Sequence, residues 1–318
     1  MGTNRNVKHL TQEKFFFSVV VPTYRRPHEL TKLLEALTQQ TFAKDIFQVI
    51  VVDDGGGIPL DCIIAPFQRV LNLTLACQEN SGPASARNYG VSFAKGAFLA
   101  FTDDDCRPDQ GWLQALAEVL EQSPKSLCGG RTRNALVNDP FAQATQALAD
   151  YVYREYKPAH NVGAFFLTNN LALPRKDFLE MGGFDRSLRF GEDREICRRW
   201  TWRRGPLVFI PNALVYHSHS LRLASFLRLH FSYGTGTVQF KKRCVQKGLK
   251  PARLSPPSYY VKLLLFGVRE KKNVHGLLLS VLLLLSQLCY AAGYAWEAVR
   301  NLRRKSSFLN DSVTTNAL

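Results

Sequence analysis

The sequence predicts an α/β fold: a single Rossmann-like domain with a mostly parallel sheet, then a basic helical C-terminal region with one hydrophobic membrane segment. Two observations lead to this prediction. Up to about residue 217, short apolar runs alternate with helix-period patterns and several runs end abruptly in polar residues, as strands do in parallel sheets. Later, residues 274–296 contain no Asp, Glu, Lys or Arg, and about 20 such residues can cross a hydrocarbon core.

The expected elements follow one another in strand–helix order. Phe15–Pro22 has the composition of a buried strand, and His28–Gln40 predicts an amphipathic helix because its leucines recur at i, i+3, i+4 and i+7. Ser81 is expected to cap a helix that has Pro83 in its first turn. Further strands are expected at Phe47–Val52, Leu71–Ala76, Phe98–Thr102 and Leu207–Val215, and further helices at Trp112–Leu120 and Arg194–Arg204.

The charge of the chain is divided unevenly between its two halves. Residues 1–150 hold 14 Lys and Arg against 16 Asp and Glu, whereas residues 151–318 hold 27 against 10. The basic half predicts a phosphate-bearing partner, such as a nucleotide, a nucleic acid or an anionic membrane. A nucleic acid is disfavoured, because the one basic cluster, Arg198–Arg204, has neither a stacking platform nor a reading helix beside it.

The apolar segment 274–296 is expected to insert into a membrane. Basic clusters flank it on both sides, and Tyr290, Tyr294 and Trp296 gather at one end as interfacial anchors do. A membrane crossing, a shallow hairpin with the apolar run Tyr259–Val268, and a buried core helix remain open alternatives. The expected boundaries are an N-terminal arm at 1–14, the α/β domain at 15–222, a basic amphipathic helical region at 223–273, the membrane-inserted helix at 274–296 and a polar basic tail at 297–318.

Three consecutive aspartates follow the strand expected at Phe98–Thr102. Adjacent carboxylates at the end of a buried strand repel one another, and a divalent cation relieves that repulsion. Oxygen ligands suit Mg²⁺ or Mn²⁺, and side-chain alternation places Asp103 and Asp105 on one face with Asp104 pointing away. A solvated acidic turn is the alternative interpretation.

Other polar groups stand at further strand and helix ends. Asp53 and Asp54 could accept hydrogen bonds from a nucleobase or ribose, or could simply form a turn with the glycines that follow. Arg87 offers a guanidinium for phosphate or carboxylate, or is a surface arginine. Two further sites are open in the same way: Glu192-Asp193, as a general base or as helix-dipole partners, and His217 with His219, as metal ligands or solvated loop residues.

Taken together and in this order, the motifs resemble those of the family 2 glycosyltransferases with the GT-A fold. The matching stretches are VVVPTYRRP (19–27), VVDDG (51–55), NSGPASARNYG (80–90), FTDDD (101–105), TNNLALPR (168–175), GGFD (182–185) and GED (191–193). They extend over about residues 15–220. Each motif is short, and the resemblance depends on all seven occurring in the right order.

The resemblance implies a role for each matching residue. Nucleotide contacts would come from Pro22, Thr23, Asp53 or Asp54 (with Asp54 preferred) and Arg87. The cation, Mn²⁺ or Mg²⁺, would be held by Asp103 and Asp105 of the family's D-x-D pair, with His217 as a later ligand. Asn169, Asn170 and Glu192 would lie near the transferred sugar, and Asp193 would be the base that deprotonates the acceptor hydroxyl.

The activity implied is metal-dependent, inverting transfer of one sugar from a nucleotide-diphosphate sugar to a lipid-linked or cell-surface glycan precursor. A UDP-sugar is the expected donor, with GDP- and TDP-sugars as alternatives. Processive synthases of the family carry a Q-x-x-R-W motif, which Arg199-Trp200 lacks, so single transfer is expected. We expect membrane association with the catalytic domain on the cytoplasmic side, since seven scattered cysteines without a C-x-x-C pair indicate reduced thiols. The alternatives are a tethered transferase with a soluble acceptor and a catalytically silent membrane adaptor that binds anionic lipid through the basic half.

Overall fold

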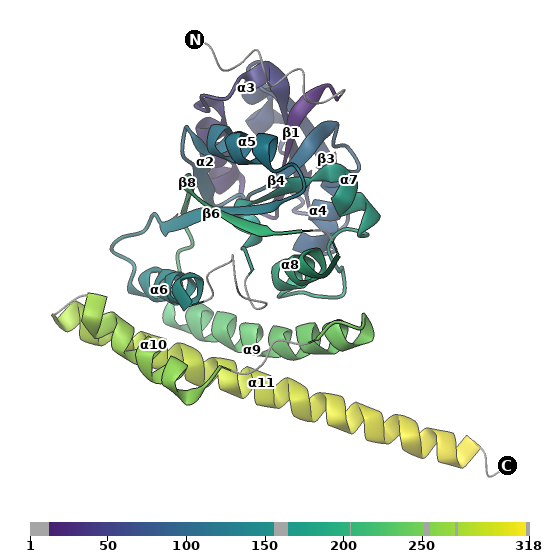
Figure 1. Cartoon of the computed structure of the whole chain (residues 1–318), viewed down its shortest axis with the longest axis vertical. Helices are drawn as coiled ribbons and strands as arrows, with labels where there is room; N and C mark the ends of the chain where they lie inside the picture. Colours follow the sequence, from purple (N-terminus) through teal and green to yellow (C-terminus); the bar gives the residue numbers. More distant parts are fainter. Residues whose placement is uncertain (1–12, 156–164, 204, 251–254, 271–272, 316–318) are drawn as a thin grey trace. The chain divides into compact units, whose positions relative to one another are not determined.

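The computed structural model describes residues 13–155, 165–203, 205–250, 255–270 and 273–315, with side chains up to residue 303 (Figure 1). The chain divides into two compact units. The described residues of Met1–Val137 and Val152–His219 form the first, which we name the sheet unit. Those of Asn138–Tyr151 and Ser220–Leu318 form the second, the helical unit.

Within the described residues, eight strands form one sheet in the order β3-β2-β1-β4-β7-β6-β8-β5. Strands β3, β2, β1 and β4 form one half of the sheet and run parallel, as do β6 and β8, whereas β7 and β5 pair antiparallel with their neighbours. The predicted fold class, a mostly parallel α/β sheet followed by a helical region with one apolar helix, is confirmed. The strand bounds are Phe15–Thr23 (β1), Phe47–Asp53 (β2), Asn72–Cys77 (β3), Gly96–Phe101 (β4), Cys106–Pro108 (β5), Leu127–Asn134 (β6), Leu171–Pro174 (β7) and Leu207–His217 (β8).

Alternation along the buried strands supplies both layers of the core. In β1, Val19 and Val21 face a cluster that includes the leucines of α2, whereas Val20 faces the opposite cluster with Phe184 and Trp200. Helices α2, α3 and α5 therefore cover one face of the sheet, and α4, α7 and α8 the other. Their bounds are Pro27–Thr38 (α2), Asp61–Gln68 (α3), Pro83–Val91 (α4), Trp112–Gln122 (α5), Arg175–Glu180 (α7) and Glu192–Arg203 (α8), with short 3-10 turns at Lys44–Ile46 and Thr168–Asn170.

The expected strands and helices of the sheet unit are all present within a few residues of their predicted ends. One local expectation was wrong. Ser81 does not cap α4: the cap position is Gly82, with φ of 86°, a left-handed conformation that favours glycine. The hydroxyl of Ser81 instead donates to the carbonyl oxygen of Glu79 (2.9 Å).

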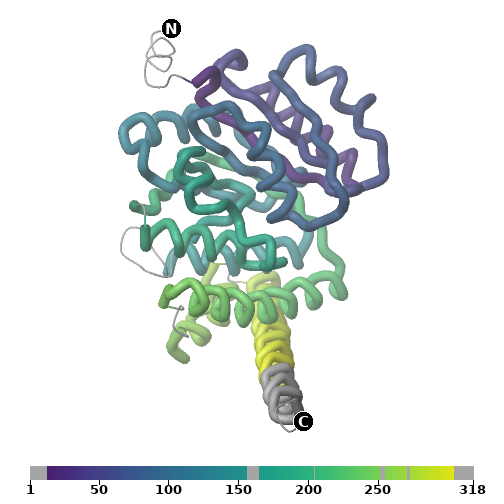
Figure 2. The backbone as a smooth tube through the Cα atoms, turned by 90° about the vertical axis from the view of Figure 1, so that its right-hand side faces the viewer, coloured from purple at the N-terminus to yellow at the C-terminus, as the bar shows by residue number. Residues whose placement is uncertain are grey.

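The helical unit consists of α6 (Pro140–Glu155) as far as Tyr151, α9 (Leu223–Gln246), α10 (Pro257–Glu270) and α11 (Val274–Thr315). Its own core joins Tyr151 of α6, Phe226 of α9, Phe266 of α10 and Leu283 of α11. Figure 2 shows α9 (green) and α11 (yellow) in contact, where the Tyr290 hydroxyl donates to Thr237 Oγ1 (2.9 Å).

Among the described residues, one helix, Val274–Arg303 within α11, is long and apolar enough to cross a membrane. A third of its most apolar stretch, 33%, is buried against the rest of the protein. Core helices can share this length and composition, so the helix suggests membrane association without establishing a crossing.

Candidate active site

The carboxyl ends of three neighbouring parallel strands bring the predicted polar residues together in the sheet unit. Thr23, the last residue of β1, is in register with Asp53, the last residue of β2. On the other side of β1, β4 runs parallel to it and leads directly into Asp103. The crevice beyond the carboxyl ends of such strands is where open α/β sheets bind ligands.

The three consecutive aspartates face three different sets of partners. Asp103 Oδ1 accepts a hydrogen bond from Arg87 Nη2 (2.6 Å). Asp104 is buried and accepts from the Thr23 hydroxyl (2.8 Å) and from Arg26 Nη1 (3.2 Å). Asp105 is also buried and shares the same Arg26 nitrogen (2.8 Å). The three aspartates therefore do not form a solvated acidic turn. Each is held by hydrogen bonds from other side chains, and Asp104 and Asp105 are buried.

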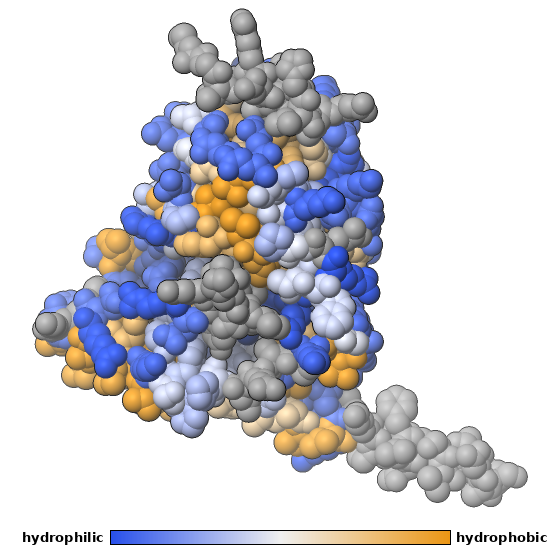
Figure 3. Space-filling view, viewed as in Figure 1, coloured by the Kyte–Doolittle hydropathy of each residue, from blue (hydrophilic) through white to orange (hydrophobic). Residues whose placement is uncertain are grey.

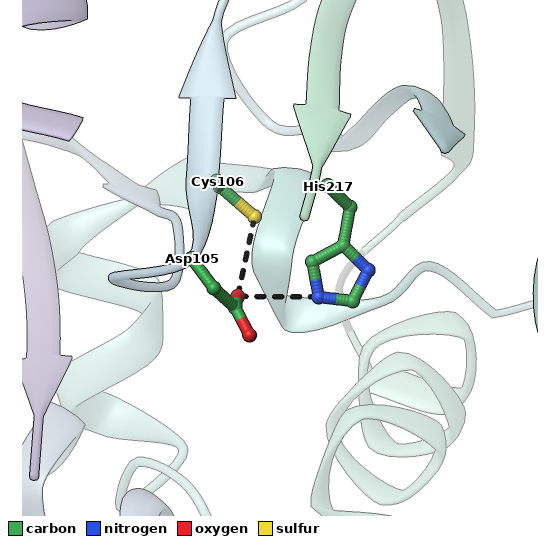
Figure 4. Close-up of side chains that lie close together, drawn as sticks. All are labelled: Asp105, Cys106 and His217. Atoms are coloured by element: carbon green, nitrogen blue, oxygen red, sulfur yellow. Dashed lines mark hydrogen bonds and ion pairs between the residues drawn. The ribbon is translucent and has the colours of Figure 1, made fainter. Parts of the chain in front are cut away.

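Asp105 and His217 form a pair across the end of the sheet (Figure 4). Antiparallel pairing of β5 with β8 sets Cys106 opposite His217, which brings His217 Nε2 to 3.1 Å from Asp105 Oδ1. Burial tends to raise the pKa of Asp105, but the hydrogen bond and charge of His217 outweigh it and hold that pKa below its usual range. Burial tends to lower the pKa of His217, but the hydrogen bond and charge of Asp105 outweigh burial and raise that pKa above its usual value.

The ligating atoms of Asp105, Cys106 and His217 all lie within 4.8 Å of one another. Burial raises the pKa of the Cys106 thiol well above its ordinary value, so this sulfur stays protonated and is a poor ligand. The carboxylate oxygen and imidazole nitrogen suit a cation that takes hard or intermediate ligands, such as Mn²⁺. Among the described residues, Asp103 does not join this group, because it faces Arg87 instead.

Arg87 links the end of β4 to the beginning of α8. Its side chain is 4% exposed, and Nη1 donates to Glu192 Oε1 (3.1 Å) while Nη2 donates to Asp103. Its guanidinium carbon lies 5.9 Å from the centre of the Phe184 ring. Arg87 Nε is buried without a hydrogen-bond partner among the described residues. Arg87 is therefore neither a surface arginine nor a free phosphate ligand, but the bridge between two acidic groups.

The cluster carries more negative than positive charge. Burial raises the pKa of Asp104 to about 6 and, together with Asp193, raises that of Glu192 to about 7. Burial also raises the pKa of Asp193. The carboxyl groups are Asp103, Asp104, Asp105, Glu192 and Asp193, and the arginines that contact them are Arg26 and Arg87. An additional cation would relieve this excess, and in that respect the residues fit a divalent ion.

The two aspartates that end β2 differ in how many donors they already hold. Asp54 is 4% exposed, and its carboxylate accepts from Gln78 Nε2 (2.6 Å) and from the backbone N–H groups of Ser81 and Gly82 (both 2.9 Å). Asp53 is partly exposed and, within the described residues, accepts a hydrogen bond from the Gly56 N–H (2.8 Å). Asp54 thus anchors the loop before α4, and Asp53 retains oxygen lone pairs for a ligand.

The neighbouring Asn169 and Asn170 also differ. Asn170 is 2% exposed, accepts from Trp112 Nε1 (2.9 Å) and donates to the carbonyl oxygens of Arg131 (3.1 Å) and Ala213 (2.9 Å). These bonds place Asn170 in the scaffold between β6, β7 and β8. Asn169 accepts a hydrogen bond from the Thr132 hydroxyl (3.2 Å) through its amide oxygen. This contact leaves its amide nitrogen able to donate to a ligand.

Pro22, another predicted nucleotide contact, lies in β1, in register with Val52.

The loop that delivers α8 is fixed by groups that the sequence alone did not single out. Asn88 of α4 donates to the Phe184 carbonyl oxygen (2.8 Å) and accepts from the Phe184 N–H (2.9 Å). A β-carbon at Gly183 would lie 2.5 Å from Asn88 Oδ1, and the φ of Gly183 is 71°, so only glycine fits there. Within α8, Arg199 pairs with Glu195 (2.6 Å) and donates to the carbonyl oxygen of Met181 (2.6 Å).

Arg26 is the contact that sequence reasoning missed. It stands in the stretch YRRP that leads into α2, where Arg25 has a φ of 56°, the one positive φ of a residue other than glycine in the described part of the chain. The sequence shows two adjacent arginines, Arg25 and Arg26, between the first strand and the helix after it. Nothing local indicated which of them reaches the aspartates, because Asp104 lies 78 positions further along the chain.

Comparison with known proteins identifies the family. Residues 18–182 match the family model described as "Glycosyl transferase family 2". A curated relative, "Glycosyltransferase AglE" of Haloferax volcanii, is 30% identical over 70% of this chain and 73% of its own length. The "Pre-mycofactocin glycosyltransferase" of Mycobacterium tuberculosis is 27% identical over 68% of this chain but only 46% of its own length.

Solved structures share the fold at low sequence identity. The mannosyltransferase PcManGT of Pyrobaculum calidifontis, in complex with GDP-Man and Mn²⁺, is 17% identical, with a TM-score of 0.59 over 94% of this chain and 86% of that one. TarS of S. aureus, residues 1–349, is 18% identical, with a TM-score of 0.52 over 91% of both chains. The family match, the AglE relative and the GT-A-type arrangement of strand ends lead to one conclusion: this chain belongs to glycosyl transferase family 2 and is a glycosyltransferase.

Proposed function

We propose that this glycosyltransferase is metal-dependent and inverting, and that it moves one sugar from a nucleotide-diphosphate sugar to a hydroxyl of a lipid-linked or cell-surface glycan precursor. The observation that carries the proposal is the pairing of Asp105 with His217, in the same cluster in which Arg87 joins Asp103 to the beginning of α8. The proposed ion ligand Asp105 thus follows Asp103 closely in the chain, and Arg87 joins Asp103 to Glu192, the neighbour of the candidate base Asp193.

Asp105 and His217 are the residues that would hold a divalent ion, with Asp103 facing the diphosphate. When bound, the ion would neutralise charge that develops on the leaving diphosphate. Arg26, now shared between Asp104 and Asp105, would then be released to contact the same phosphates. Its side chain is 46% exposed, so it can move without disturbing the core.

Asp193 is the proposed general base. It lies in the first turn of α8, and its Oδ1 accepts from the N–H of Arg194 (2.7 Å). Burial raises its pKa, which brings a carboxylate closer to the basicity that proton abstraction near neutral pH needs. Attack by the activated hydroxyl on the face opposite the leaving group inverts the anomeric carbon, and no carboxylate is needed as a covalent nucleophile.

The donor is proposed to be a UDP-sugar, with GDP- and TDP-sugars as the other possibilities. TarS has been solved with UDP and with UDP-GlcNAc, and PcManGT with GDP-Man. For this chain, Asp53 is the preferred contact to the nucleoside, because Asp54 is already saturated by the loop before α4. Asn169 is preferred to Asn170 as a contact to the sugar for the same reason.

The acceptor class is proposed from the names of similar proteins and from the apolar helix of this chain. One relative, TarS, is named as a poly(ribitol-phosphate) β-N-acetylglucosaminyltransferase. Single transfer is proposed because Arg199 and Trp200 lack the glutamine of a Q-x-x-R-W motif, and both are buried in the scaffold of α8. We propose membrane association, with the catalytic unit on the cytoplasmic side, where nucleotide sugars are made.

Thermal shift on the full chain tests the donor site first. UDP, GDP, TDP and CMP are each added with Mn²⁺ or with EDTA, and a ligand at 100 times its Kd should stabilise the protein by about 2.7 kcal/mol. A Mn²⁺-dependent shift with one nucleotide supports the proposal and identifies the base. No shift with any of them contradicts it and favours the catalytically silent membrane adaptor.

Substitution of the proposed base separates binding from chemistry. Asp193→Asn should keep the nucleotide shift and lower kcat by roughly 10²–10⁴-fold, the usual contribution of a general base. Asp61→Asn, the same change at an exposed position in α3, is the matched control and should leave kcat unchanged. Undiminished transfer by Asp193→Asn would remove it as the base.

A further inference from the structure

The face of α11 that points away from α9 is largely apolar between Val274 and Leu302. Of the 20 exposed large apolar side chains in the described part of the chain, 12 lie on α10 and α11. Those of α11 are between 43% and 80% exposed and recur at helical spacing, so they form one stripe about 42 Å long at 1.5 Å per residue. They are Val274, Leu277, Leu278, Val281, Leu284, Leu288, Trp296, Val299 and Leu302.

The opposite face of α11 is occupied by α9. A β-carbon at Gly293 would collide with the carbonyl oxygen of Phe231, and one at Gly234 with that of Tyr290, so the two backbones touch. Hydrogen bonds continue the contact: Tyr290 donates to Thr237, and Gln239 donates to Glu297, which is 3% exposed (3.3 Å). Figure 1 shows the two helices running alongside each other.

Because α9 packs along α11, it is unfavourable for α11 to cross a membrane. Phe226 of α9 packs in one cluster with Leu282 and Leu283, which lie near the middle of the apolar segment. Arg228, half a turn further along α9, is exposed. If α11 crossed a bilayer with α9 beside it, Arg228 would stand near the centre of the hydrocarbon layer, where a charged side chain is strongly disfavoured.

The charges around the apolar stripe complement an anionic surface. Residues 220–303 contain 14 Lys and Arg but only two acidic residues, Glu270 and the buried Glu297. On α10, Lys262 and Arg269 are exposed beside the apolar positions Val261 and Leu265. Figure 3 shows apolar side chains gathered along the free edge of these helices, with hydrophilic ones beside them. An apolar face edged with Lys and Arg is the pattern of helices that lie in a membrane interface.

We propose that the helical unit lies in the plane of an anionic membrane, with the outer stripe of α11 buried in one leaflet and neither α10 nor α11 crossing it. Both ends of α11 then stay on the side of the sheet unit. The inference concerns the mode of membrane binding and holds whichever sugar and nucleotide the enzyme uses.

Two measurements on the full chain test this arrangement. Sedimentation with vesicles of phosphatidylcholine alone, or with 30% phosphatidylglycerol as the anionic probe, measures binding; we expect binding that requires the anionic lipid and weakens with salt. Alkaline phosphatase or green fluorescent protein fused after Leu318 in Escherichia coli reports the side of the C-terminus. We expect fluorescence without phosphatase activity, because phosphatase folds only outside the cytoplasm.

A matched pair of variants identifies the surface. Leu288→Glu changes a 58%-exposed residue of the stripe, and Val245→Glu a 63%-exposed residue of α9. Leu288→Glu should reduce vesicle binding by at least roughly tenfold, as the loss of one buried leucine implies, while Val245→Glu retains it. Circular dichroism melting shows that both variants are folded.

Three results would overturn the proposal. Phosphatase activity of the C-terminal fusion would show that α11 crosses the membrane. Equal binding to neutral and anionic vesicles would remove the role of the basic residues. A dimer in solution that Leu288→Glu converts to monomer, without vesicle binding by the parent chain, would show that a second copy covers the stripe. None of these depends on sugar transfer, so failure here is distinct from failure of the proposed reaction.

Discussion

The ends of β2 and β4 look alike in sequence and differ in the structure. Both strands are buried, and both run into consecutive aspartates. After β2, Asp54 takes three donors from residues 78–82 and shapes a loop, whereas Asp53 accepts from the Gly56 N–H. After β4, each aspartate faces a side chain from a different part of the sheet unit: Arg87, Thr23 with Arg26, or His217.

We propose that this difference separates a structural carboxylate from a ligand-binding one. Backbone N–H groups fix Asp54 at close to neutral cost, since each donor gains an acceptor. Apart from the Thr23 hydroxyl, the side chains that contact Asp103–Asp105 are themselves ionisable, and they can be exchanged for a ligand without exposing the backbone. Burial with exchangeable charged partners is therefore the better indicator of a binding site.

The largest expected effect comes from the β4 end. Asp105→Ala should abolish Mn²⁺-dependent nucleotide binding and reduce transfer by about 10³-fold or more, because it removes a proposed ligand and the partner of His217. Isothermal titration with Mn²⁺ and a transfer assay measure both. Asp53→Ala is the comparison at the β2 end, with a raised KM expected and kcat retained; equal loss in the two variants would break the distinction.

An intermediate effect is expected for Asp54→Ala, on stability. Three donors in part-buried hydrogen bonds lose their acceptor. We expect a total cost of about 1–3 kcal/mol, the penalty of one fully buried unsatisfied donor, because water reaches this loop. The melting temperature should then fall by roughly 2–12 °C, given about 2–4 °C per kcal/mol for a unit of this size. Calorimetry on Asp54→Ala and Asp53→Ala provides the test. A larger loss for Asp53→Ala would reverse the roles assigned to the two residues.

The smallest effect concerns the pH dependence of stability. Burial and Asp193 raise the pKa of Glu192 to about 7 from an ordinary 4.5, so the folded state keeps a proton that the unfolded chain releases. This contribution is complete below pH 4.5 and is lost as the pH rises toward 7. Glu192→Gln, which stays neutral, should melt with a shallower pH dependence between pH 4.5 and 7 than the parent chain. An unchanged slope would show that Glu192 titrates normally.

The strands and helices that hydrophobic periodicity predicted correctly are those whose apolar residues pack in the core. Strand β1 and helix α2 carry continuous apolar runs or faces, and both were predicted within a few residues. Strand β6 was missed because it contains Gly129 and Gly130, which give no apolar signal in the sequence. Glycine is needed there because β-carbons would collide with Phe166 and Asn170, which come from distant parts of the chain. Strands β5 and β7 have only 3 and 4 residues, too few to show a period.

The site was predictable in kind and less so in detail. Residue types and their order indicated the acidic cluster, Arg87 and the beginning of α8. The preference for Asp54 over Asp53 had no local basis, because the donors that occupy Asp54 lie 24–28 positions away. The same holds for Asn170, whose partners come from Trp112 and Ala213. These assignments remain to be tested by the variants above.

The two hydrogen bonds between Asn88 and Phe184 have a mechanical consequence. They join α4 to the loop before α8 in both directions, so we expect the helix that carries Arg87 and the helix that carries Asp193 to move together. In the proposed reaction, opening for the exit of the nucleotide would then fall to the segment after β1, where Arg25 has a left-handed backbone and Arg26 is half exposed. The enzyme would release its product by loosening the segment after β1, while the wall that holds the base stays in place for the next acceptor.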